Sequence, residues 1–238
     1  IAPQGVHSDQ LAMDLFGRLL ARVGCGADEV SNVIATGYAR NAITIAGSTI
    51  TEITCHACGV HHLVPDARTI IEIGGQDSKL LQLDHNGNVQ DFAMNDRCAA
   101  GTGRFLEVVA ERLEVDIESL GIMAARSRRP AAISSMCIVF AETEIIGLLA
   151  SGAAPEDIVA GVQNSIATRV ATMAGRSIRP PVVFTGGVAM IPGMDTALES
   201  VVGHPVSTAP EPQFTGALGA AILAARFEHS PSFKVSMI

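Results

Sequence analysis

The sequence lacks long apolar runs and an excess of basic residues. Its longest apolar tracts, such as GALGAAILAA (216–225), fall well short of the ~18 consecutive apolar residues that a transmembrane helix needs. Lysine and arginine number 16 against 24 aspartates and glutamates, which gives a formal net charge of −8. Because broad nucleic-acid binding depends on clustered lysine and arginine that displace counterions, this balance argues against such a partner. We therefore expect no membrane and no nucleic-acid interaction.

Cysteine is also scarce. Five cysteines at wide spacings do not make the paired framework of a small secreted disulfide protein. The sequence begins IAPQGVHSDQ, without a methionine and without the basic and then apolar segments of a secretion signal. We expect a reducing, cytoplasmic setting and a natural N-terminus upstream of Ile1.

What the chain does contain is a well-buried composition with alternating strand and helix patterns. Its 238 residues are 48% hydrophobic and 17% charged, and this length is close to the ~250 residues at which a single core stops growing. Apolar spacing and turn signals predict helices over 9–23, 51–64, 99–113, 117–125, 138–152, 155–176, 192–202 and 215–229, and strands over 32–40, 70–74, 79–84, 89–95, 131–135, 181–187 and 204–208. This alternation predicts an α/β architecture, with a hinge at RSRRP (126–130).

The motif IIEIGGQDSK (70–79) runs from a buried strand into a polar turn. Gly74 and Gly75 let a phosphate approach the backbone. Asp77 could hold Mg²⁺ directly or through water, and Ser78 or Gln76 could orient a water. An ordinary β-hairpin turn with solvated polar residues accounts for the pattern equally well, because Gly-Gly turns are common.

Two further glycine turns have the same character. In AAGTGRF, Gly101, Thr102 and Gly103 stand at an expected helix start, where N–H groups attract anions. In VVFTGGVAM, a buried strand ends at Gly186 and Gly187, a turn that lets a flat ring lie close to the chain. None of the turns follows the Gly-x-x-x-x-Gly-Lys-Ser/Thr loop or the dinucleotide Gly-x-Gly-x-x-Gly fingerprint. They favour a nucleotide cleft without naming its chemistry.

Cys98 and Cys137 each precede an expected helix, in NDRCAAGTG and SSMCIVFAE. Unpaired N–H groups at a helix N-terminus stabilise a thiolate, so both positions suit an anionic metal cluster. An iron–sulfur cubane usually takes four thiolates, and a two-fold dimer supplies them as two from each subunit, with the cluster on its axis. A lone cysteine is more often a small buried apolar residue, and the residues alone leave that alternative open.

The other three cysteines form no complete site. Cys55 and Cys58 make a Cys-x-x-Cys motif on an expected helix with three histidines nearby. A four-ligand zinc site needs a second such motif or a clear histidine pair, and the sequence has neither. Cys25 lies between two glycines with no visible partner. We assign these cysteines no role.

The motifs resemble one family in their order and spacing: IEIGGQDSK, FAMNDRCAAGTGRFLE, ISSMCIVFAETEI, VVFTGGVA and the closing TGALGAA. It is the ATPase family that includes activators of 2-hydroxyacyl-CoA dehydratases and the ATP-binding subunits of benzoyl-CoA reductase. ATGYAR and TEITCHACG fit its upstream pattern, so the resemblance covers nearly the whole chain. It implies an α/β, actin/hexokinase/Hsp70-like fold with ATP between two lobes. We expect these lobes at residues 1–95 and 96–238, the terminal helix returning toward the first.

The resemblance also implies the site residues. Cys98 and Cys137 match the family's ligands to one [4Fe-4S] cluster that bridges a homodimer or a pair of homologous subunits. ATP, ADP and Mg²⁺ are the implied ligands of the other matches, in which Gln76 and Asp77 have the catalytic role. These matches are a second phosphate motif, a nucleotide-contacting turn and an adenosine motif: Gly74, Gly75, Gln76 and Asp77; Gly101, Thr102 and Gly103; and Gly186, Gly187 and Val188.

The sequence departs from the family pattern in two places. Members begin with a strand and a phosphate loop of the form GIDxGSTTTK, and no such segment occurs in this sequence. We expect either that this segment was truncated or that ATP binding is impaired. Cys58 stands where members commonly carry another residue.

The function implied by the resemblance is ATP-driven electron delivery. A ferredoxin or flavodoxin supplies one electron to the shared cluster, ATP closes the lobes, and the electron passes to an iron–sulfur dehydratase or reductase that acts on a CoA thioester. Two alternatives keep the fold. One is a small-molecule kinase of the acetate or sugar kinase type, with Asp77 or Glu142 as base. The other is a non-catalytic nucleotide-binding module, which the missing phosphate loop suggests.

Overall fold

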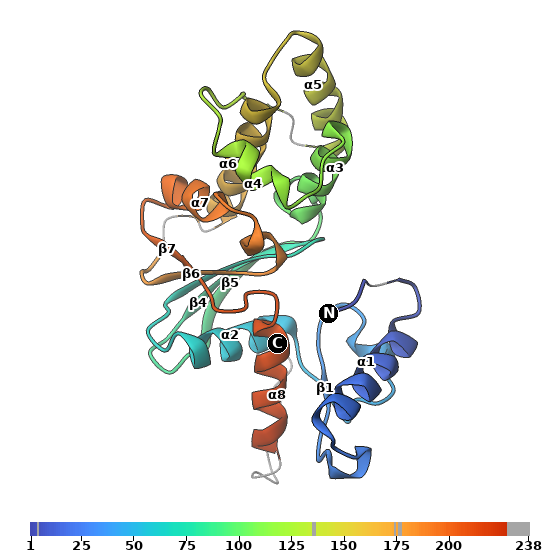
Figure 1. The fold of residues 1–238 in the computed structure, drawn as a ribbon. Coiled ribbons are helices and arrows are strands. Elements are labelled where there is room, and N and C mark those ends of the chain that lie inside the picture. Colours follow the sequence, from blue (N-terminus) through green and yellow to red (C-terminus); the bar gives the residue numbers. More distant parts are fainter. Residues whose placement is uncertain (4, 135–136, 174, 176–177, 228–238) are drawn as a thin grey trace. The chain divides into compact units, whose positions relative to one another are not determined.

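The structure, a computed structural model, describes residues 1–3, 5–134, 137–173, 175 and 178–227 (Figure 1). The chain divides into two compact units, one of Ile1–His62 with Gly216–Ile238 and one of Leu63–Thr215. These units divide the chain at other points than the expected lobes of residues 1–95 and 96–238. The lobe assignment itself stays a prediction.

The first unit contains a small parallel pair of strands and three helices. Its elements are α1 (Ser8–Val23), β1 (Ile34–Ala35), β2 (Ser48–Thr49), most of α2 (Glu52–Leu63) and most of α8 (Thr215–Phe227), with short 3₁₀ turns at Ala27–Glu29 and Arg40–Ala42. Helix α1 ends at Gly24, which takes the left-handed conformation common in C-caps. Helices α2 and α8 pack so closely that a side chain at Gly219 would overlap the Cys55 carbonyl.

The second unit is built on a five-stranded sheet with the order β5-β4-β3-β6-β7. Its strands are β3 (Thr69–Ile73), β4 (Ser78–Leu83), β5 (Val89–Asn95), β6 (Val182–Thr185) and β7 (Val206–Thr208). The first three form an antiparallel meander, whereas β6 and β7 run parallel to β3. The turn between β4 and β5 contains Gly87 at φ 79°, which its Asn-Gly sequence predicts.

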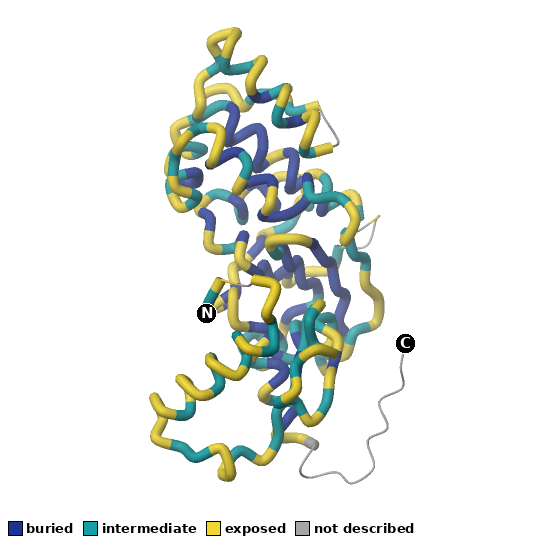
Figure 2. The backbone as a smooth tube through the Cα atoms, turned by 90° about the vertical axis from the view of Figure 1, so that its right-hand side faces the viewer, coloured by how far each residue is buried: buried dark blue, intermediate teal, exposed yellow. Residues whose placement is uncertain are grey.

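Helices α3 to α7 gather on one side of this sheet in Figure 1. They are α3 (Gly103–Leu113), α4 (Ser119–Ala124), α5 (Ile138–Ala150), α6 (Pro155–Met173) and α7 (Met194–Val202). Ile71, Ile73 and Phe184 of the sheet share one fully buried core with Phe105 of α3 and Ile166 of α6. Figure 2 shows the buried stretches concentrated in the strands and in the helices against them. The core of this unit therefore lies between the sheet and the helices packed on it.

Most of the expected elements are confirmed, and three are corrected. The expected strand 32–40 is reduced to β1, Ile34–Ala35, and a 3₁₀ turn begins at Arg40. Residues 174, 176, 228 and 229 of the expected helices lie outside the described residues. The expected strand 131–135 is wrong for residues 131–134, where the N–H of Ala131 donates to the Asp157 carbonyl and that of Ser134 to the Glu144 carboxylate. Residue 135 lies outside the described residues. The expected helix 99–113 is a 3₁₀ turn, Ala99–Gly101, followed by α3 from Gly103. Among the described residues, no helix combines the length and apolar character needed to cross a membrane.

Candidate functional site

The turn between β3 and β4 is the first component of the site. The N–H of Gly74 donates to the Asp77 carbonyl at 3.0 Å, which closes a tight hairpin turn. Gly75 is exposed, and a Cβ added there would meet nothing within 4 Å. Gln76 is exposed as well, whereas the Asp77 side chain is buried. The expected hairpin geometry is therefore present, and its tip offers open backbone at Gly75. We call residues 74–77 the phosphate turn.

A buried ion cluster lies at the base of the phosphate turn. The Lys79 ammonium contacts the Glu72 carboxylate at 3.0 Å and the Asp77 carboxylate at 2.7 Å, and the Lys79 side chain is only 3% exposed. Burial alone lowers the pKa of Lys79, but the two carboxylates outweigh it and hold this pKa above its ordinary value. Lys79 is directly opposite Glu72 in the β3–β4 pair. The cluster thus joins both strands to the turn between them.

The segment before α3 is bonded to the phosphate turn. The N–H of Gly103 donates to the Gly74 carbonyl at 2.8 Å, and that of Arg104 donates to the Gly75 carbonyl at 3.0 Å. The Thr102 hydroxyl also lies 3.2 Å from the Gly75 carbonyl. A Cβ added at Gly103 would lie 3.1 Å from the Gly74 carbonyl oxygen, a tight contact that glycine avoids.

The N–H groups of the glycine turn before α3, expected to attract an anion, are bonded to carbonyls of the protein. The N–H groups of Gly101, Thr102 and Gly103 donate to the carbonyls of Cys98, Ala99 and Gly74, respectively. They are therefore occupied within the protein and are not directed at a phosphate in this structure. The glycine turn before α3 instead helps to hold the phosphate turn in position.

The third glycine turn follows β6 and packs on the first. Gly186 has φ 92°, and a side chain there would overlap the Ile73 carbonyl at the end of β3. Both observations require glycine. Val188 follows on a 3₁₀ turn (Gly187–Met190), and its Cγ2 lies 3.1 Å from where a Cβ of Gly103 would stand. The three glycine turns of the sequence therefore meet.

A pocket of about 230 Å³ lies where these turns meet. Four of the expected residues line this pocket: Gly75, Gly103, Gly187 and Val188. Six residues that the sequence did not single out line it too: Glu107, Ile117, Glu118, Met190, Ile191 and Gln213. Glu107 follows Gly103 by one helical turn, a spacing that could have identified it. The other expected glycines, Thr102, Gln76 and Asp77 do not line the pocket.

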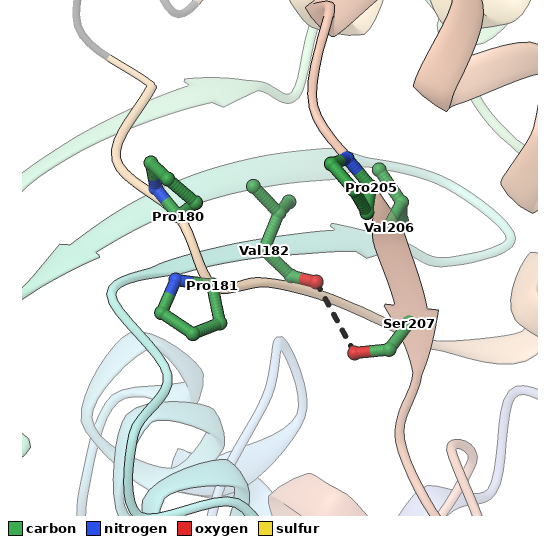
Figure 3. A pocket seen from close by; sticks show the side chains of 6 residues that line it. All are labelled: Pro180, Pro181, Val182, Pro205, Val206 and Ser207. Carbon is green, nitrogen blue, oxygen red and sulfur yellow. Dashed lines mark hydrogen bonds between the residues drawn. The ribbon is translucent and has the colours of Figure 1, made fainter.

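A second pocket of about 350 Å³ lies at the opposite ends of β6 and β7 (Figure 3). It is lined by three prolines, two valines and Ser207, whose hydroxyl donates to the Val182 carbonyl at 3.3 Å. Ligands of open parallel sheets bind at the carboxyl ends of the strands. This pocket is at the amino ends, and the described residues that line it include no ionisable side chain. The pocket at the glycine turns is therefore the candidate site.

Cys98 and Cys137 both lie immediately before a helical segment. Cys98 is half-buried, precedes the 3₁₀ turn Ala99–Gly101 and packs on the main core. It therefore lies farther from the α-helix than expected, since α3 begins only at Gly103. Cys137 is exposed and occupies the N-cap position of α5. Helices α3 and α5 are linked by an ion pair between Arg112 and Glu142.

The donor set of this chain fits part of a cluster site. Cys98 and Cys137 can supply two thiolate ligands to an iron–sulfur cubane, which usually takes four. Among the described residues, no group of three or more His, Cys, Asp or Glu side chains is arranged to hold a metal ion. A cubane on these cysteines would thus need ligands from a second chain.

The remaining cysteines have the character of packed thiols. Burial raises the pKa of the Cys55 thiol and of the Cys58 thiol. A raised pKa disfavours the thiolate that metal binding and nucleophilic attack need. The Cys25 thiol lies 3.4 Å from the Gly26 carbonyl. None of the three gains a role from its surroundings.

The fold is that of the actin-like ATPases. MreB 5 of Spiroplasma citri, solved with AMPPNP, matches with a TM-score of 0.51 and 12% identity over 94% of this chain and 77% of that one, a likeness of fold alone. Within this class, the chain belongs to the BadF/BadG/BcrA/BcrD ATPase family, whose sequence model matches residues 6–224.

Relatives in this family are named for dehydratase activation. The 2-hydroxyisocaproyl-CoA dehydratase activator of Clostridioides difficile is 45% identical over 208 residues, 87% of this chain and 78% of that protein. The (R)-2-hydroxyglutaryl-CoA dehydratase activating ATPase of Acidaminococcus fermentans is 46% identical over 199 residues, 83% of this chain and 76% of that protein. The solved C. difficile activator, with bound ADPNP, has a TM-score of 0.87 and 41% identity over 94% of this chain and 85% of that one.

Proposed function

We propose that this protein is an ATP-dependent activator that delivers an electron to a 2-hydroxyacyl-CoA dehydratase or to a partner of the benzoyl-CoA reductase type. The observation that carries the proposal is the hydrogen-bonded contact between the phosphate turn and the segment that begins at Cys98. The phosphate turn and the segment that carries the Cys98 thiol are thereby hydrogen-bonded to each other. The names of relatives that are 45% and 46% identical support the same function.

ATP, with Mg²⁺, is the proposed nucleotide. The pocket at the three glycine turns supports this, because a side chain at Gly103 would crowd the Gly74 carbonyl and the backbone at Gly75 is open. A related activator with bound ADPNP supports it as well. Asp77 would act on Mg²⁺ through water, since its carboxylate is engaged by Lys79. Ion pairs also weigh against the kinase alternative, in which Asp77 or Glu142 would be the base, because Lys79 engages Asp77 and Arg112 engages Glu142.

Cys98 and Cys137 are the proposed ligands of a [4Fe-4S] cluster, to which a second subunit would contribute two more cysteines. A cluster of this kind supplies a one-electron carrier when bound. Partial positive charge at the start of α5 would stabilise the Cys137 thiolate. The first turns of α5 expose Val139, Phe140 and Ile146 to 63%, 68% and 50%, respectively. Such an apolar surface beside Cys137 supports a subunit contact there.

The proposed electron donor is a ferredoxin or flavodoxin, and the acceptor is an iron–sulfur dehydratase or reductase. Reduction of a CoA thioester requires a potential below that of ordinary donors, so nucleotide energy must drive the transfer. In this chain, the residues that connect the phosphate turn to Cys98 and to Cys137 would convert nucleotide binding into movement of the two thiols.

Iron and sulfide analysis of the anaerobically purified full-length protein tests the proposal. We expect about four iron and four sulfide per dimer, and an EPR signal after reduction. Cys98→Ala and Cys137→Ala should each lose the iron, whereas the matched variant Cys58→Ala should retain it. Unchanged iron in both cysteine variants, or ATP-dependent phosphorylation of a small acid or sugar that persists in them, would contradict the electron-transfer function.

A further inference from the structure

Asn95 holds the backbone of Cys98 on both sides. It is the last residue of β5, and its Nδ2 donates to the Cys98 carbonyl at 2.8 Å while its Oδ1 accepts from the Cys98 N–H at 3.0 Å. The two residues between them are exposed, Arg97 almost completely. The position of Cys98 is therefore set by the end of a strand and not by the loop that leads to it.

Asn95 is also the neighbour of the phosphate turn. The β4–β5 register pairs Asn95 with Ser78, the first residue after that turn. A Cβ added at Gly101 would lie 2.9 Å from the Asn95 Nδ2 and 3.8 Å from the Ser78 hydroxyl. Gly101 thus leaves the space in which the Asn95 amide lies against both strands.

The segment from Cys98 to Arg104 is attached to the phosphate turn at two points. One is the Ser78–Asn95 pair, through which the Asn95 amide holds Cys98. The other is the set of bonds from Gly103 and Arg104 to the carbonyls of the turn. Because packed interiors pass displacements on instead of absorbing them, a shift of the turn must move this segment.

We infer that Asn95 is a positioning residue through which a nucleotide at the phosphate turn sets the orientation and accessibility of the Cys98 thiol. The inference deepens the proposed function and rests on its nucleotide site. Within the described part of the chain, the Cys137 carbonyl accepts from the N–H of Ala141 in its own helix, and no side chain holds the Cys137 backbone as Asn95 holds that of Cys98. Nucleotide control therefore acts on one cysteine of the two.

Thiol alkylation of the full-length protein, freed of metal by anaerobic chelation, tests this inference. The rates at Cys98 and Cys137 are measured by peptide mass spectrometry with and without Mg·ADPNP. In the wild type, we expect ADPNP to change the Cys98 rate by at least about fivefold, the lower end of ordinary coupling between two sites. The Cys137 rate should stay unchanged.

In Asn95→Ala, the two Cys98 rates should converge while ADPNP still binds. Asn95→Asp keeps the side-chain volume and the acceptor but loses the donor, and it serves the same purpose should the alanine variant not fold. The matched control Asn164→Ala, on the exposed face of α6, should keep the wild-type response. A faster Cys98 reaction with an unchanged nucleotide ratio would mean a purely structural role and would overturn the inference. If the wild-type protein does not bind ADPNP at all, that result would instead refute the proposed function.

Discussion

The two cysteine-bearing starts differ in how firmly they are held. Cys98 is half-buried, its backbone is bonded by Asn95, and the segment after it is bonded to the phosphate turn. Cys137 is exposed, and the helix after it presents Val139 and Phe140 to solvent. One thiol thus lies on a segment bonded to the phosphate turn, whereas the other is presented on a surface. The difference teaches that the two proposed cluster ligands need not respond equally to nucleotide.

Removal of the buried cation should damage the firmly held side most. Lys79→Met leaves the Glu72 and Asp77 carboxylates buried together, which we expect to lower the free energy of unfolding by about 3–5 kcal/mol. The matched variant Arg112→Met breaks the surface pair with Glu142 near α5 and should cost only about 0–1 kcal/mol. Urea unfolding of both variants measures the difference. Equal losses would contradict the comparison.

The pH dependence of the same cluster has a defined sign. The folded-state pKa of Lys79 lies above the ordinary value, so its contribution to stability is complete below about pH 10.4 and is lost as the pH rises through the folded pKa. The stability difference between the wild type and Lys79→Met should therefore shrink on the alkaline side.

Glycine-to-alanine changes should have opposite signs on the two sides. A Cβ at Gly103 would lie 3.1 Å from the Gly74 carbonyl, a backbone atom, and we expect Gly103→Ala to destabilise by about 1–3 kcal/mol. On α5, a Cβ at Gly147 meets nothing within 4 Å, so Gly147→Ala should stabilise by up to about 1 kcal/mol through helix propensity. Urea midpoints of the two variants check this, and a stabilised Gly103→Ala would show that the contact is not tight.

The smallest effect concerns the segment that leads to Cys137. Asp157 accepts hydrogen bonds from the Ser127 hydroxyl at 2.7 Å and from the N–H groups of Arg128 and Arg129 at 2.9 Å. Asp157→Asn should leave global stability nearly unchanged but speed tryptic cleavage after Arg126 and Arg128 several-fold. Asp84→Asn, which removes a similar carboxylate from the β4–β5 turn, is the control and should not alter these cleavages.

The acid limb of this effect follows from the pKa of Asp157. The Ser127 hydroxyl, and then the N–H groups of Arg129 and Arg128, hold that pKa below its ordinary value. The anchoring is therefore present above about pH 3.9 and is lost as the pH falls through the folded pKa. The protection of the Arg128 and Arg129 amides against hydrogen exchange should therefore fall only below about pH 3.9.

Local patterns in the sequence predicted most of the second unit. The meander of three strands followed from its apolar alternation and from the Asn86–Gly87 turn, and α5 from its apolar run after Cys137. The expected strand was wrong for residues 131–134 because a β-like composition does not guarantee a neighbouring strand. Its N–H groups at Ala131 and Ser134 are taken by Asp157 and Glu144 instead.

The site was predictable only in part. The glycine turns could be identified individually, because each places glycine where a strand ends or a helix begins. The Glu72–Lys79–Asp77 cluster depends on the register of β3 against β4, which a linear pattern does not reveal. The engagement of the N–H groups of Gly101, Thr102 and Gly103 depends on where the 3₁₀ turn ends and α3 begins, a boundary that spacing fixes poorly.

The contact of Gly186 with the Ile73 carbonyl has a consequence for recombination between relatives. Since no side chain fits between the two backbones, the end of β3 and the end of β6 must match in shape, although more than a hundred residues separate them in the chain. A chimera that inherits one of these strand ends from a diverged parent and the other from this protein would join surfaces that never evolved together. Crossover points that keep the end of β3 and the end of β6 from the same parent preserve the contact of Gly186 with Ile73.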